Sequence, residues 1–417
     1  MRGAILLLVL AAGCATAPVR NAAPDEPAAA QRRELLPPLP EPGQQGAGAA
    51  DEATVIAMPP ALGACDWPLF EHYVARFVSE DGRVIDRTDR DKSTSEGQSY
   101  GLFFALVAGD RPLFDKLLRW TEDHLAGGDL RRQLPAWKWG RAEDGRWRVL
   151  DANPASDADL WIAYVLHEAG RLWDEPSYIF LGRQVLALIE KHEVEDLPGL
   201  GPMMLPGPYG FEVEEGRAWR LNPSYLPPQL LRRFEERGPW RAVRENTLRL
   251  LRESTPAGLA ADWILWHRDH GFGVDPVHGP MGSYDAIRVY LWAGFLDADD
   301  PLRAAWAGAV HGLWDEWRRQ GHVPERLDVT DPGDSRAGPP GFVAALLPEA
   351  VARGDGAAAG ELEALLARSW NGTLYGNPPT YYDQNLILFA RGFVEGRYAF
   401  APDGTLQTRW DGGGCGE

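Results

Sequence analysis

The sequence predicts an all-α protein, specifically an (α/α)6 toroid, or barrel, of six helical hairpins. From Cys65 onward the apolar residues recur at the three- and four-residue spacing of a buried helix face, and no convincing run alternates as a strand would. The connections between the expected helices also alternate between short and long. Short connections force antiparallel neighbours, so six hairpins in series place one ring of helices inside another.

The apolar spacing predicts twelve helices. They fall over residues 66–79, 96–108, 111–126, 155–173, 176–192, 223–236, 239–254, 282–296, 300–320, 340–352, 358–370 and 380–393. From the third onward, each odd-numbered helix follows a short connection, such as Gly109-Asp110 or Asp174-Glu175, and the odd-numbered set should form the outer ring. The even-numbered helices mostly follow long loops rich in Gly, Pro and Trp, such as residues 126–154 and 193–222. These loops share one end of the toroid with the N-termini of the inner helices, and function is expected on that face.

Residues 1–14 have the form of an export signal. One Arg precedes an apolar run over residues 4–12, which is too short to span a membrane, and the segment ends in Ala-Ala-Gly-Cys. This end resembles a bacterial lipobox, although Ala11 stands where Leu is usual. We expect lipid on Cys14 and a periplasmic protein anchored to the outer membrane. The alternative is plain cleavage, which would leave a soluble periplasmic or secreted protein.

The next segment, residues 15–60, is rich in Ala, Pro, Gln and Glu and has no periodicity, so it predicts a disordered tether to a folded domain over residues 61–410. If Cys14 carries lipid, Cys65 and Cys415 remain as a pair in an oxidising compartment, one at each end of this domain. We hypothesise a disulfide between them. The alternative is two unrelated cysteines.

The charge and composition narrow the class of partner. A formal net charge of −18 and a sequence pI near 5.0 argue against nucleic acid or an anionic membrane surface, so membrane contact is expected only through the lipid. The 17 Trp offer flat faces on which sugar rings stack. The nine His are scattered, and no glycine-rich phosphate loop is present. We expect a neutral polymer or a small molecule as ligand, with no metal and no cofactor.

Acids and tyrosines recur at the N-termini of the inner helices. The starts of the second, fourth, sixth, eighth and twelfth helices read Ser95-Glu96, Ser156-Asp157-Ala158-Asp159, Asn222-Pro223-Ser224-Tyr225, Ser283-Tyr284-Asp285 and Tyr381-Tyr382-Asp383. We take Ser95 as the N-cap of its helix. Each acid alone is explained by the helix dipole. That alternative does not predict the aromatic residues Trp137 and Trp139 in a loop of the same face, so a carboxylate-lined cleft is the preferred interpretation.

Separated carboxyl groups beside aromatic rings suit hydrolysis of a glycosidic bond. One carboxyl must be protonated to supply a proton to the leaving oxygen, and the other must be ionised to activate water or attack the sugar. Arg288 follows Asp285 by one helical turn and would keep that aspartate ionised. A structural ion pair is an equal alternative.

These motifs resemble glycoside hydrolase family 8. The resemblance rests on Thr94-Ser95-Glu96-Gly97-Gln98-Ser99-Tyr100, on Ala155-Ser156-Asp157-Ala158-Asp159 with Ile162-Ala163, and on Ser283-Tyr284-Asp285-Ala286-Ile287-Arg288. Leu134-Pro135-Ala136-Trp137 and residues 221–228 look most like the periplasmic members of bacterial cellulose-synthesis operons. Val165 and His167 depart from the usual signature beyond the acids. The resemblance runs from about Cys65 to about Phe400.

The resemblance implies an (α/α)6 catalytic domain and assigns roles to the site residues. Glu96 matches the proton donor, Asp285 the base that activates water, and Asp157 a third acid that binds the distorted sugar. Descriptions of the family differ on which of the two aspartates is called the base or nucleophile. Beside them, Tyr284 and Arg288 match positioning groups. The candidates for glucose-stacking subsites are Trp137, Trp139, Tyr225 and Tyr382, for which loop packing is the alternative.

The implied activity is that of an endo-β-1,4-glucanase, a cellulase that cleaves β-1,4-glucan with inversion. By the subgroup resemblance, it would trim glucan beside the cellulose-synthesis machinery. One alternative is a non-catalytic polysaccharide-binding component of the export machinery, and a lyase or epimerase on a similar toroid is another. Lyases and epimerases usually take His, Tyr or Arg as acid and base, whereas this face is rich in acids.

Overall fold

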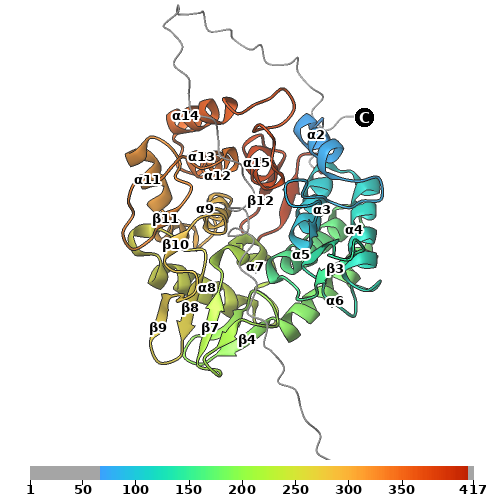
Figure 1. The fold of residues 1–417 in the computed structure, drawn as a ribbon, viewed down its shortest axis with the longest axis horizontal. Helices are drawn as coiled ribbons and strands as arrows, with labels where there is room; N and C mark the ends of the chain where they lie inside the picture. The colour runs from blue at the N-terminus through green and yellow to red at the C-terminus, as the bar shows by residue number, and fades with distance from the viewer. Residues whose placement is uncertain (1–65, 412–417) are drawn as a thin grey trace, which may run out of the picture. The chain divides into compact units, whose positions relative to one another are not determined.

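The computed structural model describes residues 66–411, in which helices are arranged around a common centre (Figure 1). The expected export signal over residues 1–14 and the tether over residues 15–60 lie outside the described residues. Cys14, Cys65 and Cys415 lie outside them as well. The lipid anchor, the tether and the disulfide therefore stay predictions. Within the described part, no helix is long and apolar enough to cross a membrane.

Six helices form the inner ring. They are α3 (Ser95–Ala108), α5 (Ser156–Leu172), α7 (Pro228–Phe234), α9 (Ala286–Gly294), α12 (Pro340–Ala345) and α15 (Tyr381–Val394). In that order each contacts the next. The ring is closed by Phe389 of α15, whose ring centroid lies 5.2 Å from that of Phe103 and 4.7 Å from that of Phe104 on α3. Helix α5 is buried continuously from Ser156 to Gly170, as a helix surrounded by protein must be.

The remaining helices cover this ring. They are α2 (Pro68–Phe77), α4 (Arg111–Leu125), α6 (Pro176–His192), α8 (Trp240–Ser254), α10 (Arg303–Ala309), α11 (Gly312–Gln320), α13 (Leu347–Ala352) and α14 (Gly356–Ala367). Helix α4 illustrates their pattern, because it buries one apolar stripe and exposes the opposite face. Its N-terminus follows a short connection in which the Asp110 side chain accepts a hydrogen bond from Leu113 N at 3.0 Å.

Three expected helices are interrupted. Pro227 and Pro228 restrict the residues before them, so the expected helix 223–236 becomes a 3₁₀ turn, η1 (Pro223–Tyr225), followed by α7. Pro348 divides 340–352 into α12 and α13. The segment 300–320 divides into α10 and α11 just before Gly312, where a Cβ would lie 2.4 Å from Ala257 O in the turn η2 (Pro256–Gly258). Close packing against that turn accompanies the break.

The described residues also contain strands, although the sequence offers no convincing alternating run. These hold thirteen strands of two to five residues, too short to show an alternating pattern. They are β1 (Ser93–Thr94), β2 (Lys138–Arg141), β3 (Trp147–Asp151), β4 (Val194–Leu197), β5 (Gly201–Met204), β6 (Glu212–Val213), β7 (Ala218–Leu221), β8 (Ile264–His267), β9 (Gly271–Val274), β10 (Met281–Gly282), β11 (Leu327–Asp328), β12 (Tyr398–Phe400) and β13 (Leu406–Thr408). The start of the expected helix 282–296 belongs partly to β10, which pairs with β11.

The strands give the long loops their structure. Antiparallel pairs join β1 to β2 and β2 to β3, β4 to β5, and β6 through β9 in sequence order. In the four-stranded sheet Trp219 is opposite Trp266, which fixes the register of the two central strands. This sheet joins the loop before α7 to the loop before α9. The long connections are therefore ordered elements that hold the starts of the inner helices.

The last hairpin, β12–β13, ties the end of the described chain to the inner ring. Leu406 N donates to Glu168 Oε2 at 3.1 Å, and Tyr164 donates from its hydroxyl to Gly404 O at 2.8 Å.

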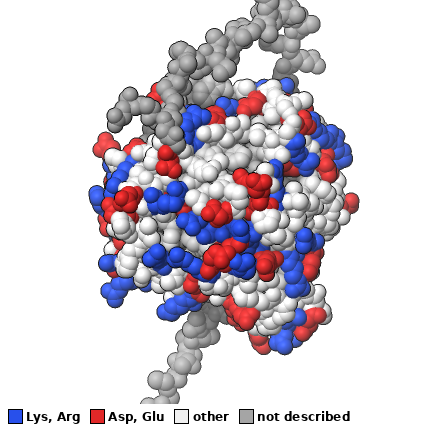
Figure 2. Space-filling view, turned by 180° about the vertical axis from the view of Figure 1, so that it is seen from behind, with Lys and Arg blue, Asp and Glu red and all other residues white. Residues whose placement is uncertain are grey.

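On the face opposite that of Figure 1, acidic and basic side chains are interspersed (Figure 2). The net negative charge is thus not gathered into a single-sign area on this face.

Candidate active site

The first acid, Glu96, lies in the first turn of α3. Thr94 is the N-cap of this helix, because its side chain accepts a hydrogen bond from Gly97 N at 3.1 Å. The expectation that Ser95 caps the helix is wrong, since Ser95 is its first residue. Ser95 N donates to Trp137 O at 3.0 Å, so the loop that carries Trp137 holds the start of α3. The Glu96 side chain is 26% exposed.

The second acid, Asp157, lies in the first turn of α5. The N-cap residue, Ala155, has no side chain able to cap the helix, and Asp157 Oδ1 instead accepts a hydrogen bond from Ala158 N at 2.8 Å. Ser156 N donates to Pro206 O at 3.1 Å, which joins this helix start to the loop after β5. Only 4% of the Asp157 side chain is exposed.

The third acid, Asp285, immediately precedes α9, and a further aspartate holds it there. Asp262 Oδ1 accepts hydrogen bonds from three helix-start N–H groups, those of Ser283, Asp285 and Ala286, at 2.8, 3.1 and 2.8 Å. Its Oδ2 accepts from Ser283 Oγ at 2.5 Å. Asp262 therefore caps the start of α9, although it lies in a different loop. The sequence analysis missed it because it lies more than twenty positions before the helix it caps.

Arg288 brings the three acids together. Its Nη1 lies 3.0 Å from Glu96 Oε1, and its Nη2 lies 3.0 Å from Asp285 Oδ1 and 3.9 Å from Asp157 Oδ2. The same Nη2 donates to Ser224 Oγ at 2.9 Å. Three helix starts that are far apart in the sequence thus face one guanidinium, of which only 4% is exposed. The three acids predicted at these helix starts therefore lie together around Arg288.

The surroundings of this cluster raise the pKa values of two of its acids. Burial raises the pKa of Asp157 to about 7, with the negative charges of Glu96 and Asp285 adding to the effect and Arg288 opposing it. Burial also raises the pKa of Asp285 to about 6, and there Arg288 is the largest opposing influence. In both aspartates burial favours the protonated form, and the charge of Arg288 opposes it.

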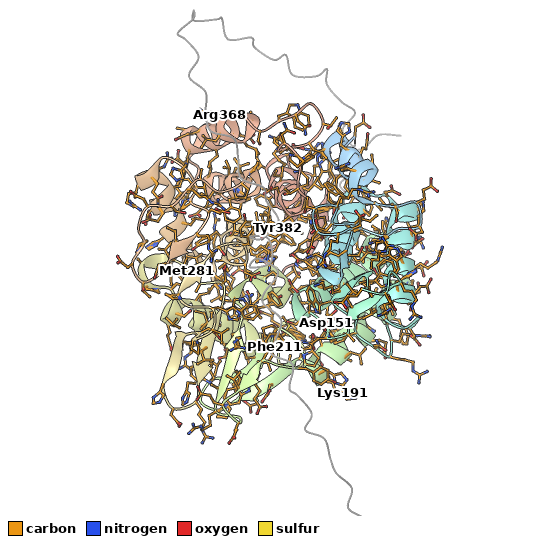
Figure 3. The ribbon with its side chains drawn as sticks, in the orientation of Figure 1. Asp151, Lys191, Phe211, Met281, Arg368 and Tyr382 are labelled. Atoms are coloured by element: carbon orange, nitrogen blue, oxygen red, sulfur yellow. The ribbon has the colours of Figure 1, made fainter. Side chains whose placement is uncertain are left out.

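Two predicted tyrosines join α9 to α15. Tyr382 of α15 donates from its hydroxyl to Tyr284 O, and their ring centroids lie 5.7 Å apart. Tyr284 in turn donates from its own hydroxyl to Glu325 Oε1 at 2.8 Å, and Arg336 pairs with that carboxylate. Tyr382 lies near the middle of the ring of helices, whereas Arg368 lies at its outer edge (Figure 3). Asp285 follows Tyr284 directly, so these contacts fix the main chain beside it.

Tyr225, also predicted, borders the acids and begins a row of aromatic rings. Its ring centroid lies 5.8 Å from the Arg288 guanidinium carbon and 6.4 Å from that of Trp263. Trp263 is stacked against Phe211 at 6.1 Å and against His278 at 4.9 Å. All four rings are half-buried, so part of each is open to solvent. The sequence analysis missed Phe211, Trp263 and His278, because single aromatic residues in separate loops carry no spacing signal.

The two tryptophans predicted as sugar platforms differ in their surroundings. Trp137 is half-buried beside the start of α3, with Lys138 Nζ 5.0 Å from its ring centroid. Trp139 is instead packed in a cluster: it is stacked on Trp147 at 5.1 Å, contacts Trp120 edge-on at 5.4 Å, and has a guanidinium 4.5 Å from its ring. This packing is the alternative considered for Trp139, and Trp137 is the better-placed platform of the two.

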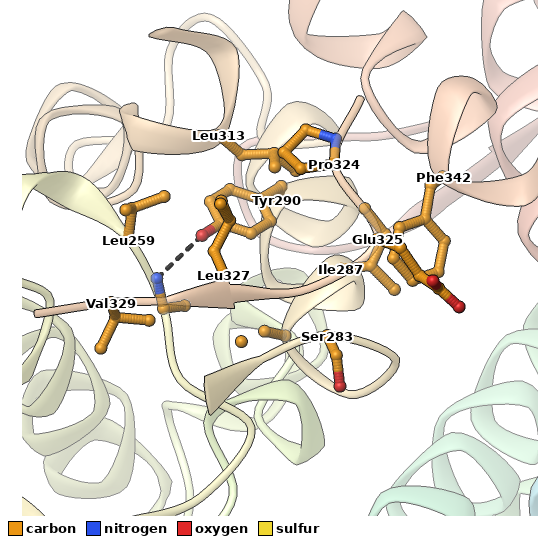
Figure 4. Close-up of a pocket in the computed structure, with 13 residues that line it drawn as sticks. Leu259, Ser283, Ile287, Tyr290, Leu313, Pro324, Glu325, Leu327, Val329 and Phe342 are labelled. Atoms are coloured by element: carbon orange, nitrogen blue, oxygen red, sulfur yellow. Dashed lines mark hydrogen bonds between the residues drawn. The ribbon is translucent and has the colours of Figure 1, made fainter. Parts of the chain in front are cut away.

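A small apolar cavity lies beside α9 (Figure 4). It encloses about 20 Å³, enough for about one water molecule, and Tyr290 accepts a hydrogen bond there from Ala260 N at 2.8 Å. A sugar does not fit, so this cavity is no alternative to the acid cluster. Among residues 66–411, no group of three or more His, Cys, Asp or Glu is arranged to hold a metal ion.

Comparisons with known proteins bear on the family and the fold of the chain. The sequence profile of glycosyl hydrolases family 8 matches residues 53–395. An endoglucanase of Xanthomonas axonopodis pv. citri is 48% identical over 379 residues, which cover 89% of this chain and 96% of that protein. An endoglucanase of Escherichia coli strain K12 is 42% identical over 349 residues, covering 83% and 92% of the two chains.

The chain belongs to glycosyl hydrolase family 8. It is therefore an enzyme that hydrolyses glycosidic bonds. The crystal structure of an endo-1,4-D-glucanase from Vibrio fischeri ES114 superposes with a TM-score of 0.77 at 40% identity, covering 83% of this chain and 99% of that one. A family 8 endoglucanase from Klebsiella pneumoniae gives 0.64 at 27% identity, covering 78% and 98%. The family 8 fold, an (α/α)6 toroid, is thus confirmed for this chain.

Proposed function

We propose that this enzyme cleaves β-1,4-glucan with inversion and trims the polymer while it is made or exported. Endoglucanase activity itself follows from the family and from relatives that match over most of their length. The observation that carries the mechanism is the convergence of Glu96, Asp157 and Asp285 on Arg288. The resemblance to periplasmic family members supports the biological role.

The exposure of the three acids supports a division of roles. Glu96 and Asp285 are 26% and 30% exposed, whereas Asp157 is 4% exposed. A base that activates water needs access to solvent, so Asp285 is the better candidate than Asp157. In this arrangement Glu96 gives a proton to the leaving oxygen, Asp285 takes one from the attacking water, and Asp157 holds the sugar at the cleavage point.

Arg288 has a defined part in this mechanism. Its positive charge opposes the effect of burial on Asp285, whose pKa is about 6, so Asp285 is ionised and able to accept a proton above that pH. The guanidinium also fixes Glu96 and Asp285 on its two terminal nitrogens, which aligns acid and base from different helices. Inversion requires room for a water between the acid and the base.

The aromatic row gives the polymer a path. Tyr225, Trp263 and Phe211 extend from the acid cluster with half-buried rings. Sugar rings stack on such surfaces through their apolar faces, and a row of them suits a chain of several residues. We infer that successive glucose units lie along this row, with Trp137 as a further platform beside α3.

The decisive test is hydrolysis of soluble β-1,4-glucan, with reducing ends counted and the product anomer followed by NMR. The parent chain should release the α-anomer. Glu96→Gln should lower kcat by about 10²–10⁴-fold and leave binding nearly intact, because it removes a proton donor and preserves shape. Glu71→Gln is the matched control, since Glu71 is an exposed acid in the first turn of an outer helix, α2.

The outcomes separate the alternatives. Near-normal kcat in Glu96→Gln would rule out Glu96 as the acid, and release of the β-anomer would rule out inversion. Binding without any cleavage by the parent chain would instead identify a polysaccharide-binding component. For the biological role, a strain that lacks the enzyme yet makes glucan of unchanged amount and length would contradict trimming.

We also propose that lipid at Cys14 anchors the enzyme to the outer membrane from the periplasmic side. The support is the short apolar run and the Ala-Ala-Gly-Cys end of residues 1–14. After expression in a bacterium, the parent chain should carry lipid and sediment with the outer membranes. The Cys14→Ser variant should carry no lipid and should not sediment with them. Metabolic labelling with a fatty acid provides the readout. Equal labelling of both chains would disprove the assignment.

A further inference from the structure

Asp159 and Glu193 are two buried carboxyl groups that the mechanism above does not use. Their exposures are 0% and 1%. Asp159 lies in the first turn of α5, two residues after Asp157, and Glu193 directly follows α6. The two side chains hydrogen-bond to each other. Apart from this mutual bond, none of their four oxygens has a partner among the described residues.

Two carboxylates in such a place would repel each other without compensation, since a buried charge needs a counter-ion or donors. Burial raises the pKa of both groups above the usual carboxyl range. Glu168, on the same helix, shows the contrast. It is equally buried, but its carboxylate takes Nε donors from Arg171 and Arg233 and the N–H of Leu406. Asp159 and Glu193 lack such donors, so the pair retains a proton.

The pair also fixes the surroundings of Asp157. The main-chain oxygen of Glu193 accepts a hydrogen bond from Leu205 N at 2.8 Å, and the next residue, Pro206, accepts from Ser156 N at 3.1 Å. The Glu193 side chain also bonds to Asp159, which lies two residues after Asp157, whereas Ser156 lies one residue before it. Asp157 is thus placed between two attachments that both lead to Glu193.

We propose that Asp159 and Glu193 form a proton-sharing carboxyl pair that positions Asp157 against the substrate. The proposal rests on the proposed function for the role of Asp157. The charged group that acts on both members is Asp157 itself, and Arg288 follows on its far side at 3.9 Å. With one proton shared, the pair sets one negative charge behind Asp157 instead of two. Both members are positioning residues, because neither contacts the Arg288 cluster in its own right.

The proton makes stability depend on pH in a definite direction. Acids whose pKa is higher in the folded than in the unfolded state bind more protons when folded. Their contribution to stability is therefore full below the unfolded value, near pH 4, and is lost as the pH rises towards the folded value. Replacing both groups by amides keeps the shape and a side-chain hydrogen bond between the two residues, and it removes this titration.

The test compares Asp159→Asn/Glu193→Gln with Asp159→Ala/Glu193→Ala in the full chain. The amide variant should keep kcat on β-1,4-glucan within about threefold of the parent. The alanine variant should lower kcat by about 10²-fold with a smaller change in KM, because Asp157 is misplaced. Between pH 5 and 8.5, the Tm of the amide variant should fall less than that of the parent. Glu168→Gln, which removes an ion-paired buried carboxylate, should instead lower Tm across the whole range.

Two results would overturn the proposal. If the amide variant loses as much kcat as the alanine variant, shape and hydrogen bonding at the pair do not position Asp157. If its Tm falls with pH as steeply as that of the parent, the pair holds no proton. The comparison of Tm between the parent and the amide variant needs neither activity nor the alanine variant. It therefore remains decisive even if the alanine variant fails to fold. Absence of reducing ends from the parent chain would refute the proposed function and leave the Tm comparison intact.

Discussion

Arg288 shows how one residue carries both structure and chemistry. It is almost fully buried and is surrounded by three carboxylates and the Ser224 hydroxyl. Removing one partner from such a buried ionic cluster leaves the others uncompensated, which costs more than the loss of a surface ion pair. The guanidinium is also planar, with paired donors that a lysine does not reproduce.

The first prediction concerns Arg288→Met. Because Arg288 lowers the pKa of Asp285, its removal should raise that pKa further and move the acidic limb of the kcat/KM profile to higher pH. At pH 6 kcat should fall by about 10²-fold or more. Arg288→Lys is the matched control, since it keeps the charge and loses the second terminal nitrogen. An acidic limb at the same pH in the parent and in Arg288→Met would contradict the role of the guanidinium.

At the scale of the element, the start of α9 depends on a residue outside the helix. Asp262 satisfies three N–H groups that would otherwise be left without partners at a buried helix end. The same contact fixes Asp285, because Asp285 N is one of the three donors. Stability and catalytic geometry therefore share one hydrogen-bonded group.

Asp262→Ala should reduce the free energy of unfolding by about 0.5–2 kcal/mol, the usual cost of a lost helix cap. It should also lower kcat, because Asp285 loses its anchor. Asp262→Asn retains an acceptor oxygen and should preserve most of both properties. Urea unfolding of the three proteins, alongside glucan hydrolysis, provides the measurement. If alanine and asparagine were equally stable, Asp262 would not act as a cap.

The elements differ in how far the sequence predicts them. Long inner helices such as α3, α5 and α15 have enough apolar residues for the period to be read, and their bounds agree with the expected ones within a few residues. The strands are too short to have a period. The prolines at 227, 228 and 348 are visible in the sequence. Whether each one interrupts its expected helix depends on tertiary contacts, which the sequence does not show.

The site follows the same rule. Glu96, Asp157 and Asp285 were predicted because each stands at a helix start within a motif. The contact between Arg288 and Glu96 spans 192 positions, and no spacing argument reaches so far. Trp139 met the compositional criterion for a sugar platform and is packed against other tryptophans instead. Trp137 and Trp139 are both half-buried, so the ring contacts of Trp139, which the sequence does not show, distinguish the two.

At the scale of the whole molecule, aromatic side chains hold the ring together. Phe389 of α15 lies within 5.3 Å, between ring centroids, of Tyr100, Phe103 and Phe104 on α3 and of Trp161 and Trp292 on two further inner helices. Its side chain is fully buried. One residue near the C-terminal end thus contacts inner helices from most of the chain.

Phe389→Ala should therefore leave a cavity at the centre of the toroid and lower the free energy of unfolding by about 3–5 kcal/mol. Phe389→Leu keeps more of the volume and should cost less. Urea unfolding followed by near-ultraviolet circular dichroism measures both, because the signal reports the packing of the aromatic rings. Similar losses for the two variants would show that the centre does not depend on ring packing at this position.

The closing of the ring by α15 also sets the order in which activity arises during synthesis. A growing chain that has reached residue 300 already contains Glu96, Asp157, Asp285 and Arg288. It still lacks the Tyr382 hydroxyl that binds Tyr284 O and the Phe389 side chain that joins α15 to α3. Because closure needs α15, the last helix among the described residues, a chain that stops before α15 holds every proposed catalytic group without the contacts that close the ring. We therefore expect hydrolysis only from chains in which α15 has packed against α3.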